Sequence, residues 1–497
     1  MMKHIVTLLT LIITYVYYKS KKEQRTLPPR APGHLPVIGH LLQIIKPIPV
    51  HQLFFEWSQS VGPIFTCYFG SQRWIVLNSI DIIKDLIVDR GAIYSSRNLP
   101  DTLVHDFMQG DDGGGFAFFP YGASWRRLRR IAHTGLVKSK IDTYQPILDE
   151  RRTVLLSHLY QLTQTKQGVS LSHLLEHYTM TSILAIAYGD MCSFEPGNPA
   201  LHKAFAITER AANTMGPSDQ IREFFPILKR IWPVKREKYF EVRKDFGEFY
   251  GGLLEQFKSQ YSDQDCFVKD IIELQQLTDL QIRNFIGIFV GAGSDTTTST
   301  LEWLVAFLAN HKEVQEKAYN EIIDAVGLDR IPGAQDESRL PYIQCIILET
   351  LRLRPPAPIA IPHSTTQTDI YKSWTIPKDT IVVMNLYAVH NDAARFPQPT
   401  LFQPDRHFDY VLSQKVAQTD RPHLSFSTGR RVCVGIHLAE RNLFMAVSML
   451  LACFRLERVS DELIDTDTAR DVRAPTWTPM HYRVKLVPRH DGVQSFF

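Results

Sequence analysis

The stretch that decides the fold of this chain lies near its C-terminus and reads Phe426-Ser427-Thr428-Gly429-Arg430-Arg431-Val432-Cys433-Val434-Gly435. The thiolate is the form of cysteine that binds metal, and the N-terminus of a helix stabilises its negative charge. Cys433 stands at such a place, because residues 436–451 are apolar at helical spacing. Gly429 permits a tight turn, and Gly435 lets the backbone pass close to a flat group. The stretch therefore predicts a socket for a metal-bound thiolate.

The competing interpretation is a cysteine that packs in the core without chemistry, which is the usual role of a single apolar cysteine. The neighbours of Cys433 favour the socket, since two glycines, an aromatic and an arginine at these spacings are not needed to pack a helix or a strand. Phe426 can cover the sulfur, and Arg431 can meet an anionic substituent of a cofactor. The six cysteines have no paired spacing, so we expect reduced thiols rather than disulfides or a zinc cluster.

The composition is that of an ordinary globular protein, because 44% of the 497 residues are hydrophobic and 22% are charged. The length alone would allow about three domains. No long linker, internal repeat or low-complexity stretch divides the chain, so we expect one large catalytic domain over residues 47–497. The formal net charge of +3 indicates no particular partner, and we expect no nucleic-acid binding.

The first residues of the chain differ from the rest. Residues 5–18 carry no charge, and a cluster of basic residues follows them. This pattern predicts a transmembrane signal anchor over residues 1–20, although fourteen apolar residues span only about 21 Å of a hydrocarbon core about 30 Å thick. A cleaved signal peptide is the alternative, but bulky tyrosines stand where cleavage needs small residues.

Residues 21–46 are first basic and then rich in proline. Proline fixes the backbone angle φ, so this segment predicts a stiff, non-helical hinge between the anchor and the catalytic domain. By the positive-inside rule the catalytic domain stays on the cytoplasmic side, and we expect it at the endoplasmic reticulum membrane.

The catalytic domain is expected to be mainly α with small antiparallel β-sheets. Alternating apolar patterns between residues 47 and 88, broken by Gly70, predict a first small sheet. Helical periodicity predicts helices over residues 121–134, 144–164, 170–188, 240–260, 280–310, 313–326 and 341–353. Strand patterns return at residues 374–376, 380–385 and 482–487.

The longest expected helix contains the polar segment Ala292-Gly293-Ser294-Asp295-Thr296-Thr297-Thr298. Glycine and threonine weaken a helix interior, so we expect a local opening there, where Gly293 lets a planar cofactor approach. Asp295 and Thr296 supply a carboxylate and a hydroxyl that can pass protons. Neighbouring residues do not face each other on a helix, so a relay between them needs water or a side-chain movement. A threonine-rich surface helix is the alternative, which the apolar flanking residues disfavour.

Glu349 and Arg352 are three residues apart, which places a carboxylate and a guanidinium on one face of an expected helix. On an exposed surface such a pair is common and contributes only about 0.2–0.5 kcal/mol. Arg406, in a loop further along the chain, could instead complete a buried network that holds the cysteine loop.

The segment Trp125-Arg126-Arg127-Leu128-Arg129-Arg130 divides into two helical faces. Trp125 and Arg129 share one face, where an indole N–H and a guanidinium can bind a carboxylate. The other face is a basic patch. Binding of nucleic acid is the alternative use of such a run, but no further basic and aromatic pattern accompanies it.

These four segments together resemble the motifs of the cytochrome P-450 superfamily, the haem-thiolate monooxygenases, and the resemblance extends over nearly the whole chain. The haem-binding signature is matched by Phe426, Gly429, Arg431, Cys433 and Gly435. The oxygen-activating helix is matched by Ala292, Gly293, Asp295 and Thr296. The structural triad is matched by Glu349, Arg352 and Arg406, and the propionate-binding residues by Trp125, Arg129 and His363. The sequence departs from the family pattern at two positions, His407 and Asn442.

The resemblance implies a cofactor, a reaction and partners. Haem b would be held by Cys433 as the axial thiolate ligand, and Asp295 and Thr296 would deliver protons to bound dioxygen. No flavin or nicotinamide motif is present, so electrons would come from NADPH through a separate flavoprotein reductase, with cytochrome b5 as a further candidate partner. An acidic partner could dock on the basic face formed by Arg126, Arg127, Arg130 and Arg430.

Two other functions compete with the monooxygenase. One is a haem-thiolate isomerase or dehydratase that does not use dioxygen, and the other is a non-catalytic, membrane-bound haem sensor. The proton-delivering pair Asp295 and Thr296 disfavours both.

The expected substrate is a lipophilic small molecule. By the resemblance, the substrate pocket draws on residues 95–119, 201–225, 357–361 and 475–479. The apolar side chains expected to line it are Phe116, Phe118, Phe119, Ile359, Ile361 and Trp477. A steroid, a terpenoid, a fatty acid or a xenobiotic would each fit.

Overall fold

A computed structural model describes residues 25–165, 167–192, 194–213, 223–225, 227–228, 236–261, 263–413 and 421–497. Of residues 111, 112, 213 and 236 only the backbone is described. The predicted anchor, residues 1–20, and the first part of the predicted hinge lie outside the described residues.

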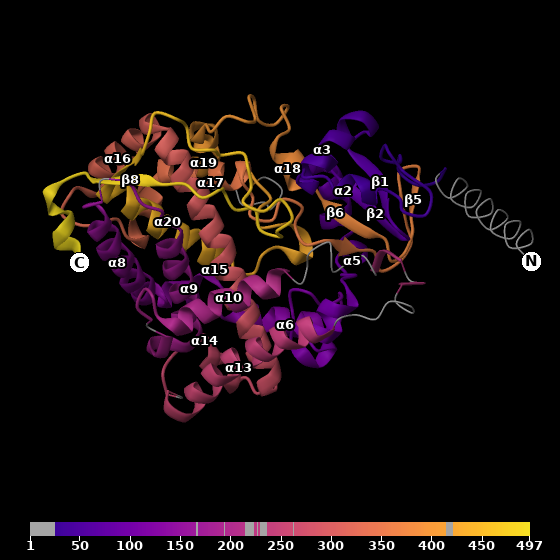
Figure 1. Cartoon of the computed structure of the whole chain (residues 1–497), viewed down its shortest axis with the longest axis horizontal. Coiled ribbons are helices and arrows are strands. Elements are labelled where there is room, and N and C mark those ends of the chain that lie inside the picture. Colours follow the sequence, from indigo (N-terminus) through magenta and orange to yellow (C-terminus); the bar gives the residue numbers. More distant parts are fainter. Residues whose placement is uncertain are drawn as a thin grey trace, which may run out of the picture.

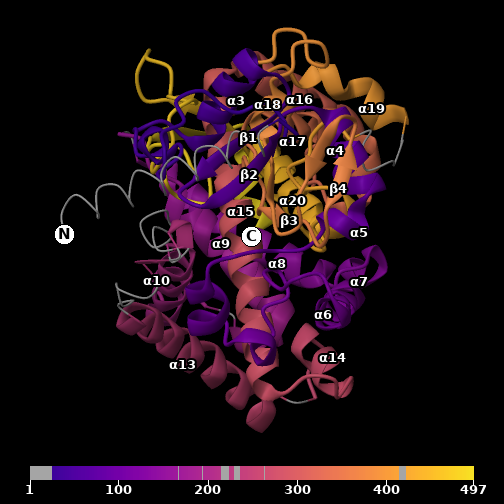
Figure 2. The ribbon, with the colours of Figure 1, turned by 90° about the vertical axis from the view of Figure 1, so that its right-hand side faces the viewer.

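The 32-residue helix α15 (Asp279–Asn310) runs through the helical part of the molecule (Figure 1), and Figure 2 shows helices packed on several sides of it. A capping box fixes its start: Gln281 N donates to Thr278 Oγ1 at 3.3 Å, and Thr278 N donates to Gln281 Oε1 at 3.2 Å. Nearly all side chains of its second half are buried. The helix therefore belongs to the core rather than to the surface.

Two large apolar clusters pack around α15. The first joins its C-terminal half to α8 (Gln145–Leu162), α9 (Ser172–Tyr188), α16 (Lys312–Val326), α17 (Pro341–Leu353) and α20 (Ile436–Cys453). The second joins its N-terminal half to α6 (Ala123–Thr134), α10 (Pro199–Asn213), α13 (Arg236–Gln260) and α14 (Phe267–Glu273). Among the described residues, α20 is the one helix long and apolar enough to cross a membrane, but 83% of it is buried inside the protein. It is a core helix.

The seven helices predicted from periodicity are all present, and α17 begins and ends at the predicted residues. The prediction missed α10. It also missed the shorter helices, which are α2 (Leu41–Ile44), α3 (Val50–Val61), α4 (Ile80–Ile83), α5 (Gly91–Tyr94), α7 (Lys138–Thr143), α14, α18 (Leu386–His390) and α19 (Phe408–Ser413). The structure thus corrects the prediction for residues 47–88, because only their central part is β-structure.

The main sheet has four strands in the order β1 (Ile64–Phe69), β2 (Gln72–Leu77), β6 (Ile381–Met384) and β3 (His363–Ser364). β1 and β2 form the predicted antiparallel hairpin, whose turn contains Gly70 with φ of +57°. β2 pairs in parallel with β6, about 300 residues further along the chain. The other strands of the described residues form two antiparallel pairs, namely β4 (Asp369–Tyr371) with β5 (Trp374–Ile376) and β7 (Phe454–Arg458) with β8 (Val484–Pro488).

The structure brings the three predicted triad residues into one buried network. Arg352 donates from Nε and Nη2 to the two carboxylate oxygens of Glu349 at 2.7 and 2.8 Å, and both side chains are fully buried. Arg406 Nε lies 3.1 Å from Glu349 Oε1. His407, one of the two departures from the family pattern, is a fourth member, because its Nε2 lies 2.7 Å from Glu349 Oε2.

In this network, the neighbouring charges and hydrogen bonds change the pKa of Glu349 more than burial does. Burial alone would raise the pKa of Glu349, but the hydrogen bonds and charges of Arg352 and His407 lower it to about 2. The carboxylate form is therefore the folded form at neutral pH. Since the pair is fully buried, the alternative of a solvated surface pair does not apply.

Replacing the buried carboxylate should destabilise the fold strongly. Glu349→Gln keeps the shape but leaves two guanidinium groups without a counter-charge, so we expect the free energy of unfolding in urea to fall by about 3–5 kcal/mol. Because the pKa of Glu349 is lowered, its stabilisation is complete above the ordinary value of 4.5 and is lost as the pH falls from 4.5 towards 2. The free energy of unfolding of Glu349→Gln should therefore fall less over this pH range than that of the unchanged protein.

A matched control is Glu313→Gln. Glu313 is exposed and pairs with the neighbouring His311 at 3.0 Å, so its loss should change the stability by no more than about 0.5 kcal/mol. Equal losses in the two variants would show that the Glu349 network does not stabilise the fold.

Candidate active site

The cysteine loop is held in place by contacts on both sides. Cys433 N donates to Phe426 O at 2.8 Å, which closes the loop on itself. Arg431 donates from Nε to Ser95 O at 2.9 Å and from Nη2 to Phe119 O at 2.7 Å. From α6, Arg129 donates to Val432 O. The loop therefore leads into α20 with its cysteine in a fixed position.

Two residues of the loop adopt left-handed backbone conformations. Gly429 has φ of +67°, and a Cβ atom there would lie 2.5 Å from Ile87 O, so both the angle and the space require glycine. Ser427 has φ of +61°, which costs a residue with a side chain about 1–2 kcal/mol.

Gly435 is different, because the protein itself does not require it. Its φ is −89°, and a Cβ atom there would meet only the Cys433 sulfur, at 4.0 Å. The absence of a side chain leaves the surface beside the sulfur open. This is the shape that a flat group needs in order to approach a sulfur ligand.

The thiol of Cys433 borders a space inside the protein. Burial raises its pKa, while the backbone N–H of Gly435 and the charge of Arg129 act in the opposite direction. The side chain nevertheless keeps accessible surface, unlike the five other cysteines, which are buried. A group that is surrounded by protein and still has accessible surface faces an internal space.

Ala292 and Thr296 lie on the interior helix α15. Ala292 keeps accessible surface in the middle of this helix, and Thr296 Oγ1 donates to Ala292 O at 2.7 Å. The helix is continuous from end to end, so the predicted local opening is not present. Its weak helix formers are accommodated because the threonine hydroxyls donate to carbonyls one turn earlier, as Thr297 Oγ1 does to Gly293 O at 2.7 Å.

The structure corrects the role predicted for Gly293. A Cβ atom at this position would lie 3.2 Å from the side chain of Ile183 in α9. Gly293 therefore permits close packing of two helices and does not provide an approach for a planar cofactor.

Asp295 points towards the C-terminal part of the chain. Its carboxylate accepts a hydrogen bond from the hydroxyl of Thr476. Burial raises the pKa of Asp295, and the Thr476 hydrogen bond acts against this effect. Thr296 donates elsewhere, so the two predicted proton-passing groups do not contact each other directly.

Two arginines and a histidine gather beside the cysteine loop with unpaired nitrogens. Among the described residues, Arg97 Nε, His363 Nε2 and Arg431 Nη1 are buried and have no hydrogen-bond partner. Burial lowers the pKa of all three groups, and neighbouring arginines add to this effect: Arg97 and Arg431 act on His363, Arg431 acts on Arg97, and Arg129 acts on Arg431. The unpaired guanidinium nitrogens of Arg97 and Arg431 need anionic acceptors, and a cofactor with carboxylate substituents would supply them.

Sequence reasoning did not find Arg97. It lies in the segment expected to line the pocket, and its Nη1 donates to Pro362 O at 2.7 Å, next to His363. No motif marks it, since its role depends on contact with residues more than 260 positions away. Trp125 also joins this cluster, because the Arg431 guanidinium lies 4.2 Å from the centre of its indole ring.

Two expectations about the substrate pocket need correction. Trp477 is only 3% exposed and packs in the core between Trp303 and His51. Phe116 and Phe119 are also buried among other core residues. Ile361, by contrast, is exposed, and its place in the substrate pocket stays a prediction.

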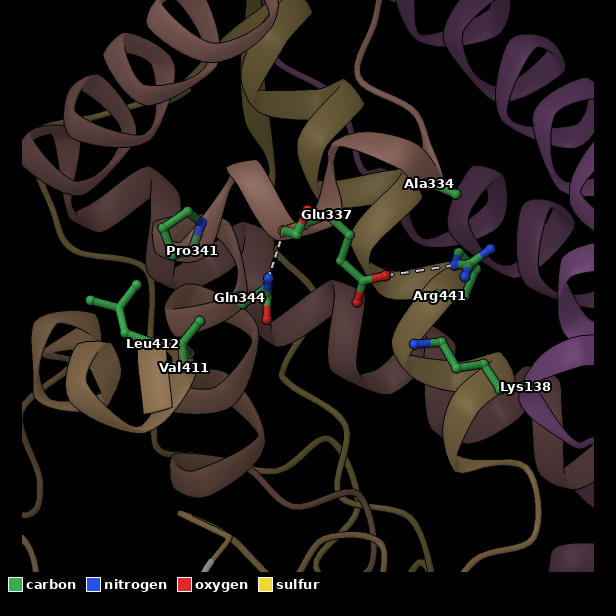
Figure 3. Close-up of a pocket in the computed structure, with 9 residues that line it drawn as sticks. Lys138, Ala334, Glu337, Pro341, Gln344, Val411, Leu412 and Arg441 are labelled. Carbon is green, nitrogen blue, oxygen red and sulfur yellow. Dashed lines mark hydrogen bonds and ion pairs between the residues drawn. The ribbon is translucent and has the colours of Figure 1, made fainter. Parts of the chain in front are cut away.

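A groove of about 400 Å³ lies elsewhere, between α7, α17, α19 and α20 (Figure 3). Lys138, Glu337 and Arg441 gather at one end, where Arg441 Nε lies 3.8 Å from Glu337 Oε2, and Pro341 and Leu412 lie at the other. No predicted site residue lines this groove. It is therefore separate from the cysteine site.

A fixed cysteine at the start of a core helix, beside unpaired buried cations, fits the class of haem-thiolate enzymes. A family model for cytochrome P450 matches residues 28–480. The chain is 31% identical to cytochrome P450 81F4 of Arabidopsis thaliana, over 95% of this chain and 94% of that protein. It is 29% identical to cytochrome P450 monooxygenase 231 of Postia placenta, over 98% and 95%.

Solved structures agree with the sequence comparison. A zebrafish cytochrome P450 solved with progesterone superposes with a TM-score of 0.76 at 26% identity, over 89% of this chain and 100% of that chain. The chain belongs to the cytochrome P450 family. It has the fold of that family and is a monooxygenase that uses haem with a cysteine thiolate ligand.

Proposed function

We propose that Cys433 is the ligand of the haem iron and that the enzyme inserts one atom of dioxygen into a lipophilic small molecule. Hydroxylation of a steroid, a terpenoid, a fatty acid or a xenobiotic fits this proposal. The observation that carries it is the accessible thiol of Cys433, which faces an internal space although protein surrounds it. Bound haem supplies the binding and reduction of dioxygen, and the protein supplies orientation and electrostatics.

The residues around the cysteine loop would hold the haem in place. The unpaired guanidinium nitrogens of Arg97 and Arg431 would donate to its carboxylates, and Trp125 would support Arg431. His363 donates from Nδ1 to Tyr94 O, so it would donate from Nε2 to a carboxylate only as an imidazolium, the form that a carboxylate stabilises. The open surface at Gly435 would receive the flat ring beside the sulfur. Phe426 remains our candidate for covering the sulfur.

Thr296 and Asp295 would deliver protons during the reaction. The Thr296 hydroxyl now donates to Ala292 O, and rotation about its Cα–Cβ bond would turn it towards the internal space. Asp295 has a raised pKa because of burial, so it holds a proton more readily than an exposed aspartate and can give it to water. Since the two side chains do not touch, a water molecule would join them.

The proposed electron donor is an NADPH-dependent flavoprotein reductase, with cytochrome b5 as a second candidate. Arg126, Arg127 and Arg130 of α6 are exposed, as is Arg430 of the cysteine loop. The guanidinium groups of Arg126 and Arg430 both lie over the ring of Tyr121, at 5.6 and 5.3 Å. These arginines form a basic face next to the thiolate, which suits an acidic partner.

The proposed location is the endoplasmic reticulum membrane, with the catalytic domain in the cytoplasm. Besides the predicted anchor, exposed apolar side chains support this proposal: Leu35, Val37, Leu42, Ile45 and Ile227. They surround the β1–β2 turn, because Gly70 N donates to Ile38 O at 3.2 Å and Ser71 N donates to Phe224 O at 2.7 Å. An apolar patch beside an anchor can enter the lipid surface.

Removing the thiol should remove the thiolate spectrum. For Cys433→Ala we expect the reduced carbon monoxide complex to lose its thiolate-type absorption band, because no other thiol lies at the site. Cys345→Ala is the matched control, since Cys345 is buried in the core and should leave the band unchanged. An unchanged band in Cys433→Ala would refute the ligand assignment.

Removing the Thr296 hydroxyl should uncouple electron use from product formation. For Thr296→Ala we expect less product and more hydrogen peroxide per NADPH, with a loss of coupling of about tenfold. Thr300→Ala removes a hydroxyl one turn further on, which donates to Thr296 O at 2.9 Å, and it should stay coupled. Tight coupling in Thr296→Ala would count against the role of this hydroxyl.

The basic face should make reduction sensitive to salt. We expect the rate of electron transfer from the reductase to fall as the ionic strength rises, and Arg127→Glu to lower it at low salt. Lys378→Glu changes the charge by the same amount at another exposed position and should leave the rate unchanged. A rate that does not depend on salt would exclude docking on this face.

The apolar patch should contribute to membrane binding. In a chain that starts at residue 25, we expect the double change Val37→Asp and Ile45→Asp to weaken binding to vesicles of neutral phospholipid about tenfold or more, because two apolar side chains no longer enter the lipid. The control is Leu463→Asp, at an exposed apolar residue in the C-terminal part. Equal binding by both variants would exclude the patch.

A further inference from the structure

The segment that contains Thr476 and Trp477 is docked on one face of α15. Ser299 Oγ and Trp303 Nε1 both donate to Trp477 O at 2.7 Å. Thr476, the residue before, donates its hydroxyl to the carboxylate of Asp295. Asp295, Ser299 and Trp303 are each four residues apart, so they lie on the same face of the helix. This face holds the segment at three points.

We propose that Thr476 is a positioning residue for proton delivery: its hydroxyl holds the Asp295 carboxyl in one orientation beside the internal space. The proposal rests on the proposed function, in which Asp295 supplies protons. In that function the protonated carboxyl gives its proton to a water molecule and becomes a carboxylate, and it regains a proton from solvent. Thr476 donates to the carboxyl throughout this cycle and is not itself consumed.

The contacts of Trp477 hold the neighbouring Thr476 in a defined position. Trp477 N donates to Pro356 O at 2.8 Å, and the Arg354 guanidinium lies 4.9 Å from the centre of the indole. The side chain is almost fully buried. A threonine attached to such a fixed residue loses little further freedom when it makes its hydrogen bond, so the orientation it imposes on Asp295 is well defined.

The other charged groups that act on Asp295 are both acidic. Glu302, two turns further along α15, and Glu209, on α10, raise the pKa of Asp295 in addition to burial. Glu302 is itself buried and lies 3.3 Å from the guanidinium of Arg470. Among the groups that act on Asp295, Thr476 is therefore the one that stabilises its charged form.

The first test measures the carboxyl directly in the resting haem protein, without electrons or substrate. Infrared difference spectra recorded against pH follow the C=O band of the protonated Asp295, which Asp295→Asn identifies by removing it. In Thr476→Val the hydroxyl is lost at nearly constant volume, so we expect the titration of this band to move to higher pH. Thr476→Ser keeps the hydroxyl and should restore the titration of the unchanged protein.

The second test measures coupling in the same variants. We expect Thr476→Val to form roughly tenfold less product per NADPH, with more peroxide, and Thr476→Ser to recover most of the loss. The matched control is Thr143→Val, at an exposed position of α7 where the hydroxyl donates to Lys140 O at 2.7 Å, away from the site. It should change neither the titration nor the coupling.

The outcomes separate this inference from the proposed function. An unchanged titration in Thr476→Val, or the same behaviour in the valine and serine variants, overturns the positioning role even if the enzyme is a fully active monooxygenase. A shifted titration with full coupling also overturns it, because the carboxyl would then be held without any use in proton delivery. Failure of the proposed function itself would appear in the Cys433→Ala spectrum, which does not depend on Thr476.

Discussion

The buried carboxylate of Glu349 ties together the parts of the chain that present the cysteine. Arg352, which it holds, donates from Nη1 to His390 O at 2.7 Å. His390 in turn accepts at Nε2 a hydrogen bond from Leu424 N at 2.7 Å, and Ser425 Oγ donates to Leu351 O at 2.6 Å. Helix α17 and the residues just before the cysteine loop are thus one hydrogen-bonded unit. Because charges buried without partners are costly, loss of one partner destabilises the whole unit.

The haem side of the site is built in the opposite way, with donors that the protein leaves unsatisfied. Each unpaired buried polar group costs about 1–3 kcal/mol, and the charges of Arg97 and Arg431 also repel each other. An anionic cofactor removes this cost when it binds. Cofactor binding therefore stabilises the folded state. The loops that carry these residues should therefore become more rigid when the cofactor binds, while the Glu349 network is complete before it.

Local patterns in the sequence predicted the helices and the cysteine loop, because helical periodicity and turn residues act over a few positions. The same patterns failed where distant segments meet. Strand β6 joins β2 from about 300 residues away, and no local signal marks Arg97 or Thr476 as part of a site. His407 stood out in the sequence only as a departure from a family pattern, and its contact with Glu349 required the folded structure.

The three glycines of the family motifs show that one sequence signature contains both residues needed for folding and residues needed for cofactor binding. Gly429 is required by its backbone angle and by Ile87, and Gly293 lies in close contact with Ile183, where α15 packs against α9. Only Gly435 has no such requirement from the protein, since a side chain there would meet nothing but the sulfur of Cys433. Two of the three glycines therefore shape the chain, and the third leaves room for the cofactor. In a motif of this kind, the residue that the protein's own contacts do not explain is the one that points to the ligand.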